Sequence, residues 1–412
     1  MSSVDTKATC VLFIGMGGRP VPALGGKTTI EAARTPNLDR LAADGMCGLM
    51  APIAPGIRAG SDTSHLALLG YDPHSCYTGR GPFECAGIGM KVGAGDVAFR
   101  CNFATVDARG VVRDRRAGRI SKGTDKLAAA LNAMQIGDVT CFVKESVAHR
   151  AGLVLRGPGL DHNVTDVDPH DAGQKYATCR ALKREARKTA EVVNEFVERS
   201  REILSQHPVN RARVKAGEKP ANALLPRGVG MAPHLPSFRK TQGMRGAMIV
   251  ETGLIRGIGF YVGLRDISVP GATGGYDTNY DGFAEAILRS ARRSGFILVN
   301  VKSPDIGGHD GEPEAKIDAI ESVDGVVGQL LDGLDFEHTL LIVSADHATP
   351  VSVGDHSGDL VPIVFYGHGV TPDRVERYGE RPCSAGLLGV IRGRDIVNIA
   401  TNLLAVQEKY GA

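Results

Sequence analysis

Three short segments in the last third of the chain combine histidine with aspartate at close spacing. Asp305 and His309 lie in SPDIGGHDG, Asp346 and His347 lie in SADHATP, and His356 lies in GDHSG. Carboxylates reduce the positive charge of a bound divalent cation, and imidazole adds affinity for Mn²⁺ or Zn²⁺. One such histidine alone is more often a surface or hydrogen-bonded residue. Together, the three segments predict a divalent metal site.

A serine suited to accept a phosphoryl group lies nearer the N-terminus. Ser61 follows Gly60 in PGIRAGSDTSHLALLGYDP, and the apolar stretch that runs to Leu69 predicts a helix beginning at this serine. A metal ion lowers the pKa of a nearby hydroxyl, and a helix N-terminus stabilises the anion that phosphorylation creates. In the alternative interpretation, Ser61 or Asp62 is only the N-cap of that helix. The two interpretations are compatible, so Ser61 is a candidate nucleophile.

Short apolar runs that alternate with helical patterns must position these residues. Buried strands are predicted over residues 10–14, 296–301, 339–343 and 361–366. Helices are predicted over residues 35–44, 314–334 and 395–405. This alternation favours an α/β fold with a parallel sheet covered on both faces. Each histidine–aspartate segment is expected just after a strand, at the sheet edge where α/β proteins bind ligands.

The middle of the chain differs in texture from its flanks. Residues 77–236 contain several short β-like pieces, a charged helical pattern over 171–206 and an exit rich in Pro, Gly and Arg. We therefore predict a smaller α/β domain over 77–236, inserted into a domain formed by residues 1–76 and 237–412. The charges of the long helical pattern are typical of a solvent-exposed face rather than of a nucleic-acid-binding stripe.

Composition excludes several classes of protein. The 412 residues are 42% hydrophobic and 23% charged, as in ordinary soluble globular proteins, and the net charge of +2 gives no field to recruit nucleic acid or an anionic membrane. No apolar run approaches the length of a membrane span or a signal peptide. Eight cysteines occur singly, which predicts reduced thiols in a cytoplasmic protein.

Several longer motifs carry a family resemblance. The segments GMGGRP, TPNLDRLAADG, YTGRGPFE, DVAFRCNFATVD, RRAGRI, PGATGGYDTNY and HSGDLVPIVFYG, together with those above, resemble the archaeal-type cofactor-independent phosphoglycerate mutases of the alkaline phosphatase superfamily. The resemblance runs from about residue 10 to 405. It implies an alkaline-phosphatase-like domain with a mostly parallel sheet and helices on both faces. It also implies an inserted substrate-binding domain, with the chemistry in the cleft between the two.

The resemblance further implies a reaction and its metal ligands. The serine takes the phosphoryl group from phosphoglycerate and returns it to the other hydroxyl, a glycolytic isomerisation through a phosphoserine. One or two divalent ions assist, Mn²⁺ first, with Zn²⁺, Co²⁺ and Mg²⁺ as alternatives. By matching positions, one ion is held by Asp305, His309 and His356, and the other by Asp346, His347 and Ser61.

The same matching suggests substrate-binding positions. In the inserted domain, the positions that match glycerate-binding residues of the family are His149, Arg150, Asp168 and Arg227. Arg256 lies where the family tends to have lysine near the phosphoryl group, so a positive charge is retained there. Surface salt bridges and loop caps are the alternative roles for these residues.

Three positions depart from the family pattern. Ile14 and Gly18 stand where the family has aspartate in its first motif, and Phe283 stands where it usually has lysine. The first aspartate is a ligand of the ion beside the serine, and isoleucine cannot coordinate a cation. We therefore expect that ion to be held weakly or to be missing.

Three functions remain open from the sequence. The leading hypothesis is a metal-dependent phosphoglycerate mutase that acts through Ser61. The second is a family member recruited to a related three-carbon phosphate or phosphonate in specialised metabolism, and the third is a catalytically silent relative that binds a metabolite. The expected partner is a small phosphorylated three-carbon acid, not nucleic acid or a membrane. The sequence is also compatible with a homo-oligomer.

Overall fold

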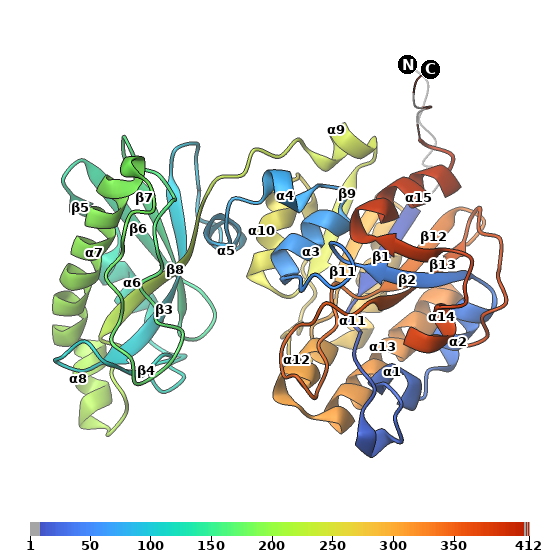
Figure 1. Cartoon of the computed structure of the whole chain (residues 1–412), viewed down its shortest axis with the longest axis horizontal. Helices are drawn as coiled ribbons and strands as arrows, with labels where there is room; N and C mark the ends of the chain where they lie inside the picture. The colour runs from blue at the N-terminus through green and yellow to red at the C-terminus, as the bar shows by residue number, and fades with distance from the viewer. Residues whose placement is uncertain (1–8, 408, 410, 412) are drawn as a thin grey trace. The chain divides into compact units, whose positions relative to one another are not determined.

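The computed structural model describes residues 9–407, 409 and 411. The chain divides into two compact units, one formed by Met1–Cys76 with Leu235–Ala412 and the other by Tyr77–His234 (Figure 1). Among the described helices, none combines the length and the apolar character that crossing a bilayer demands.

The first unit is built on an eight-stranded sheet. Its order is β10 (Arg265–Asp266), β9 (Gly246–Val250), β11 (Phe296–Asn300), β1 (Thr9–Ile14), β12 (Thr339–Ser344), β13 (Val361–Gly367), β2 (Met46–Ala51) and β14 (Gly389–Arg392). Every described strand pair in it is parallel except the two pairs that β13 makes with β12 and β2. The prediction of a mostly parallel sheet is confirmed.

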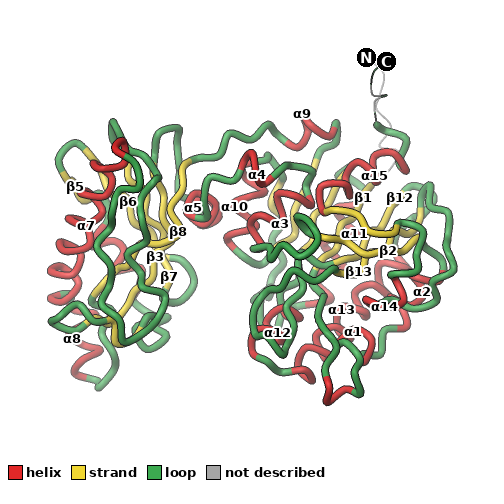
Figure 2. The backbone as a smooth tube through the Cα atoms, viewed as in Figure 1, coloured by secondary structure: helices red, strands yellow, loops and turns green. Residues whose placement is uncertain are grey.

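Helices pack on both faces of this sheet (Figure 2). On one face, α11 (Tyr280–Ala291) contacts β9, β11 and β1, and α13 (Pro313–Gly333) and α2 (Pro36–Ala43) contribute to the same core. On the other face, α10 (Gly253–Tyr261) contacts β9 and β10 and packs beside α3 (Ser61–Leu68). The remaining helices are α1 (Thr29–Ala32), α4 (Pro73–Cys76), α9 (Phe238–Gln242), α12 (Ser303–Asp310), α14 (Glu380–Cys383) and α15 (Ile396–Leu403).

The second unit has an antiparallel sheet. Its strands are β3 (Val97–Val106), β4 (Val112–Asp114), β5 (Met134–Ile136), β6 (Val139–Glu145), β7 (Arg150–Arg156) and β8 (Ala223–Met231). The helices are α5 (Gly81–Gly87), α6 (Thr124–Leu131), α7 (Arg187–Gln206) and α8 (Pro208–Lys215). Alternate residues of β3 face opposite sides, because Phe99 joins the core that includes α7 whereas Ala98 packs with Cys85 of α5.

The prediction of a helix over 171–206 is wrong in its first half, because α7 begins at Arg187. The preceding segment is extended and pairs through bridges from Lys175 to Val111 and from Ala181 to Val164. The backbone N–H of Cys179 also donates to Asn194 of α7 at 2.8 Å. These contacts satisfy the segment's backbone outside a helix, so its helical charge pattern is overridden.

The antiparallel direction of β13 decides where His356 lies. The expectation that each histidine–aspartate segment follows a strand is wrong for this residue, since His356 precedes β13. A strand that runs against its neighbours begins at the edge where they end. His356 therefore reaches the same edge of the sheet as the segments that follow β11 and β12.

Candidate active site

Ser61 is the first residue of α3, and its hydroxyl faces a histidine rather than the helix end. Gly60 is the N-cap residue of α3, and Ser61 Oγ lies 2.9 Å from His347 Nε2. The hydroxyl is buried with the residue, which is only 7% exposed. Ser61 therefore contacts His347, which a residue that served only as a helix cap would not need to do.

The partners of His347 assign its protons. Thr349 donates its hydroxyl hydrogen to Asp305 Oδ1, because a carboxylate can only accept. The Thr349 oxygen, 3.1 Å from His347 Nδ1, must then accept from that nitrogen. His347 Nε2 consequently carries a lone pair and accepts the hydrogen of Ser61. This chain of hydrogen bonds orients the serine oxygen.

The neighbouring carboxylate suits a cation. Among the described residues, the buried Asp346 Oδ2 has no hydrogen-bond partner, and it lies 3.1 Å from His347 Nε2. Two hydrogen-bond acceptors whose lone pairs face each other in a buried site repel unless positive charge lies between or beside them. Together with Ser61, these residues have the donor set for one divalent ion.

A second group of ligands lies at the same edge. The ligand atoms of Asp305, His309 and His356 are all within 4.8 Å of one another. His309 Nδ1 bonds the carbonyl of Gly354 at 3.1 Å, and His356 Nδ1 bonds that of Ala59 at 2.9 Å. These carbonyls fix Nδ1 as the protonated nitrogen of each neutral imidazole, so both Nε2 lone pairs are free for a metal. Burial lowers the pKa of His356 to about 4, which keeps it neutral.

A lysine lies within this second group. Lys302 Nζ is 2.6 Å from Asp305 Oδ2, and His309 Nε2 is 3.5 Å from the same oxygen. Burial raises the pKa of Asp305, but the Lys302 ammonium, together with His347 and His309, holds that pKa below its ordinary value. Asp305 is therefore ionised and available as a ligand.

The departures at positions 14 and 18 map to the same region. Ile14 ends β1 in register with Asn300 of β11 and Ser344 of β12, at the edge from which the ligands follow. The Ile14 side chain lies outside the described part of the structure, so its effect on a metal stays a prediction. At Gly18, an added Cβ would meet only Thr29 Oγ1 at 3.5 Å and Lys316 Nζ at 3.7 Å. A side chain therefore fits there.

The predicted substrate residues of the second unit surround an arginine cluster. Asp168 is buried and bonds Arg115 through both carboxylate oxygens, at 2.9 and 2.8 Å, and Arg227 lies 3.8 Å away. It also accepts from Asn102 at 2.9 Å. Asp168 therefore positions arginines, and its carboxylate oxygens accept their hydrogen bonds from residues of the same unit.

Positive charge exceeds negative charge in this cluster. Burial lowers the pKa of His149 to about 4, helped by Arg150, Arg116 and Arg100. Burial likewise lowers the pKa of Arg100 to about 10, and its buried Nε has no hydrogen-bond partner. Guanidinium groups gathered in this way form a site for an anion.

Arg256 and Phe283 lie elsewhere in the first unit. Arg256 Nε is 3.1 Å from Asp266 Oδ2, and one of its terminal nitrogens donates to the Val250 carbonyl at 3.1 Å. Phe283 is fully buried on α11, and both residues line a cavity of 200 Å³. Among the described residues, neither side chain forms a hydrogen bond or ion pair with Ser61.

Four residues of these sites were not predicted from the sequence. They are His65 and Lys302 in the first unit and Arg100 and Arg115 in the second. Arg100 and Arg115 fall within the motifs AFRCNF and RRAGRI, and His65 lies four residues after the serine. Position within a family motif was the available signal.

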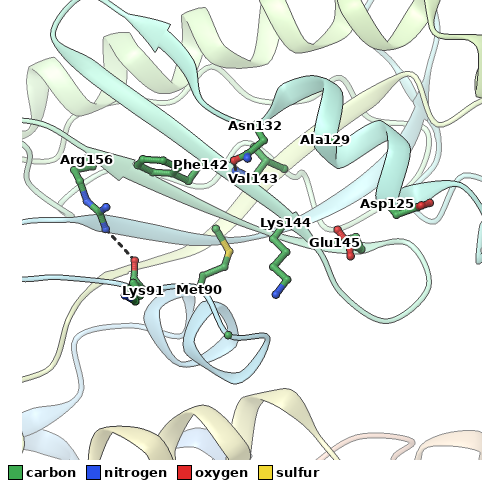
Figure 3. A pocket seen from close by; sticks show the side chains of 11 residues that line it. Met90, Lys91, Asp125, Ala129, Asn132, Phe142, Val143, Lys144, Glu145 and Arg156 are labelled. Carbon is green, nitrogen blue, oxygen red and sulfur yellow. Dashed lines mark hydrogen bonds between the residues drawn. The ribbon is translucent and has the colours of Figure 1, made fainter.

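A further pocket in the second unit has a volume of 370 Å³ and contains no predicted site residue. Figure 3 shows Arg156 donating to the Lys91 carbonyl, at 3.0 Å, beside the Phe142 ring. Acidic and basic side chains, Glu145 and Lys144 among them, share its wall. Because acidic and basic side chains both line the pocket, its charge favours neither an anionic nor a cationic ligand.

The comparisons with known proteins agree on one family. Residues 42–210 match the family model for 2,3-bisphosphoglycerate-independent phosphoglycerate mutase, and residues 272–360 match that for type I phosphodiesterase / nucleotide pyrophosphatase. The chain is 49% identical to the 2,3-bisphosphoglycerate-independent phosphoglycerate mutase of Methanosphaera stadtmanae, over 98% of this chain and 99% of the relative. An enzyme of the same name from Methanothermobacter thermautotrophicus is also 49% identical, over 98% and 100%.

Two solved structures are similar to the chain over nearly its whole length. The cofactor-independent phosphoglycerate mutase from Thermoplasma acidophilum has a TM-score of 0.72 at 38% identity, over 96% of this chain and 100% of that one. A protein from Pyrococcus horikoshii has a TM-score of 0.87 at 36% identity, over 98% and 100%.

Proposed function

The chain belongs to the 2,3-bisphosphoglycerate-independent phosphoglycerate mutase family, and on that premise we propose that it interconverts 2- and 3-phosphoglycerate through a phosphoserine on Ser61. The observation that carries the proposal is the buried Ser61 hydroxyl, which lies 2.9 Å from His347 Nε2, a nitrogen that is itself 3.1 Å from Asp346 Oδ2. A hydroxyl hydrogen-bonded to an imidazole that is fixed in place is suited to become a nucleophile.

The reaction balances as two phosphoryl transfers. Ser61 gives up its proton, and its Oγ forms a bond to phosphorus while the ester bond to the departing glycerate oxygen breaks. That oxygen takes a proton and becomes a hydroxyl. In the second transfer, the adjacent hydroxyl of the glycerate loses its proton and its oxygen forms a bond to phosphorus, while the bond from phosphorus to Ser61 Oγ breaks and Ser61 regains a proton. The serine lies at the N-terminus of α3, where the helix favours the phosphoserine anion.

Two ion-binding groups support this chemistry. We assign one divalent ion to Asp305, His309 and His356, and a second, weaker one to Asp346, His347 and Ser61. When bound, such ions stabilise the anionic oxygens of the serine and of the phosphoryl group. Mixed imidazole and carboxylate ligands suit Mn²⁺, with Zn²⁺, Co²⁺ and Mg²⁺ as alternatives.

The arginine cluster of the second unit supplies a place for the anionic substrate. We propose that His149, Arg150 and Arg227, together with Arg100 and Arg115, bind the carboxylate and hydroxyl groups of the glycerate, and that Asp168 holds the arginines in place. All eight cysteines are free thiols and seven are buried, which supports a reducing compartment such as the cytoplasm as the place where the protein acts. The pathway we propose for it there is glycolysis.

The test is direct phosphorus NMR of the Mn²⁺-loaded protein with 3-phosphoglycerate. We expect 2-phosphoglycerate to accumulate to equilibrium, and Ser61→Ala to slow this by at least about a thousandfold. The folded state should survive, because Gly60 and not Ser61 is the N-cap residue. Ser75→Ala, which changes an exposed serine on α4, is the matched control. Wild-type turnover by Ser61→Ala, or no isomerisation by the loaded wild type, would refute the proposal.

A further inference from the structure

Three polar side chains on one face of α3 contact the segment that carries Asp346 and His347. Ser61, Ser64 and His65 occupy positions i, i+3 and i+4 of the helix, which lie on the same face. Ser61 contacts His347 as described, and the Ser64 hydroxyl donates to the backbone carbonyl of Asp346. The helix is thus attached to this segment at two points, and His65 adds a third.

The contacts of His65 determine which of its nitrogens carries hydrogen. Nδ1 lies 2.6 Å from the backbone carbonyl oxygen of Ser61 and 3.7 Å from Asp346 Oδ2. Both of these oxygens are acceptors, so Nδ1 is the protonated nitrogen. The other nitrogen, Nε2, must then hold a lone pair.

That lone pair is left unsatisfied. His65 is 0% exposed, and its Nε2 has no hydrogen-bond partner in the described part of the chain. Burying an acceptor without a donor is unfavourable, and such groups are uncommon in folded proteins. An apolar residue would avoid the penalty. What histidine adds at this position is the Nδ1–H group, directed at the backbone of the serine and the carboxylate of Asp346.

We propose that His65 is a positioning residue for phosphoryl transfer: its Nδ1–H donates to the Ser61 carbonyl and faces the Asp346 carboxylate, and so holds the Ser61 hydroxyl at His347. The inference deepens the proposed function and rests on it. His65 touches neither substrate nor reacting atoms. Its role is to fix the angle of the first turn of α3, since small displacements of a nucleophile reduce the rate strongly.

The test compares two substitutions at position 65 in the full-length, Mn²⁺-loaded protein. His65→Leu removes the donor and also the unsatisfied lone pair, so we expect an unchanged midpoint of thermal unfolding, kcat lower by about 100-fold and KM within about twofold. His65→Asn places an amide N–H close to the position of Nδ1 and should return kcat to within about tenfold of wild type. His74→Leu, at an exposed histidine of α4, is the matched control.

Two kinetic results would overturn the proposal. They are a His65→Leu enzyme with wild-type kcat, or a His65→Asn enzyme as slow as His65→Leu.

A readout without turnover separates this inference from the proposed function. Nitrogen-15 NMR of the wild-type histidines reports which ring nitrogen of His65 is protonated, and the signal missing from the spectrum of His65→Leu or of His65→Asn is that of His65. A protonated Nδ1 is expected, and a protonated Nε2 would overturn the inference even if one of the two variants failed to fold. A wild-type enzyme without mutase turnover would instead refute the proposed function.

Discussion

The two units gather opposite charges by different means. At the edge of the first unit's sheet, aspartates and neutral imidazoles direct lone pairs at one another, and backbone carbonyls hold the imidazoles in the required tautomer. In the second unit, arginines crowd around the buried carboxylate of Asp168. The first arrangement suits a cation and the second suits an anion.

The contrast shows how buried polar groups encode a ligand. A lone pair without a donor, as at Asp346 Oδ2, and a donor without an acceptor, as at Arg100 Nε, are both unfavourable until a ligand of the complementary type arrives. Metal binding and substrate binding should therefore be separable by substitution.

The largest effect should come from the histidines of the first unit. His309→Ala and His356→Ala should each lower Mn²⁺ affinity by at least about 100-fold, because each removes an oriented lone pair from a group of three protein ligands. Metal analysis after dialysis measures the loss. His74→Ala is the control, since His74 is an exposed histidine of α4 that lies outside this group. Unchanged metal content in both test variants would mean that the ligands are assigned incorrectly.

In the second unit, Arg100→Gln should produce the complementary result. Removal of this half-buried cation should raise KM for phosphoglycerate by about 10–100-fold, the usual effect of losing a charged hydrogen bond. Bound Mn²⁺ should stay constant. Arg187→Gln, at an exposed arginine on α7, should alter neither quantity. A fall in metal content with Arg100→Gln would break the separation of the two sites.

A substitution at position 14 tests how strongly the first unit holds the ion beside Ser61. With Ser61, Asp346 and His347 as its only assigned ligands, the ion beside the serine should be weak, and the isolated chain should carry closer to one ion than to two. Ile14→Asp restores a carboxylate at the end of β1 and should tighten that ion by about tenfold and raise turnover. Calorimetric titration with Mn²⁺ gives the stoichiometry. Tight binding of two ions by the unmodified chain, unchanged by Ile14→Asp, would contradict a weakened site.

The smallest effect concerns a buried lysine. Lys316 donates to the carbonyls of Gly17 and Thr349 at 2.6 and 2.8 Å, and burial lowers its pKa from 10.5 to about 8. Between these values the unfolded chain binds more protons than the folded one, so this group makes stability rise with pH.

A carboxylate introduced by Gly18→Asp would lie near Lys316 Nζ and raise the pKa of the lysine. The variant should gain about 1 kcal/mol below pH 8, and the gain should shrink as the pH approaches 10.5. Urea unfolding across this range measures the difference. A constant difference would show that the new carboxylate does not pair with Lys316.

Much of the fold and part of the candidate site could be predicted from the sequence, because they depend on local patterns. The sequence predicts the strands β1, β11, β12 and β13 from their apolar runs, and it predicts the start of a helix at Ser61. Tertiary pairing decided the rest. The segment before α7 is extended because it bridges to residues distant in sequence, and His356 reaches the site because β13 runs antiparallel. No local spacing signals that Asp168 would bond Arg115, 53 residues away.

The strand order also has a consequence for the synthesis of the chain. β1 lies between β11 and β12, and β2 lies between β13 and β14, so the strands made first are not neighbours of one another. Their partners are translated only after the whole of Tyr77–His234. On the ribosome, the second unit can therefore complete its own sheet while β1 and β2 still have unpaired edges. Nascent chains that stall before β11 should carry a protease-resistant second unit and a protease-sensitive N-terminal segment.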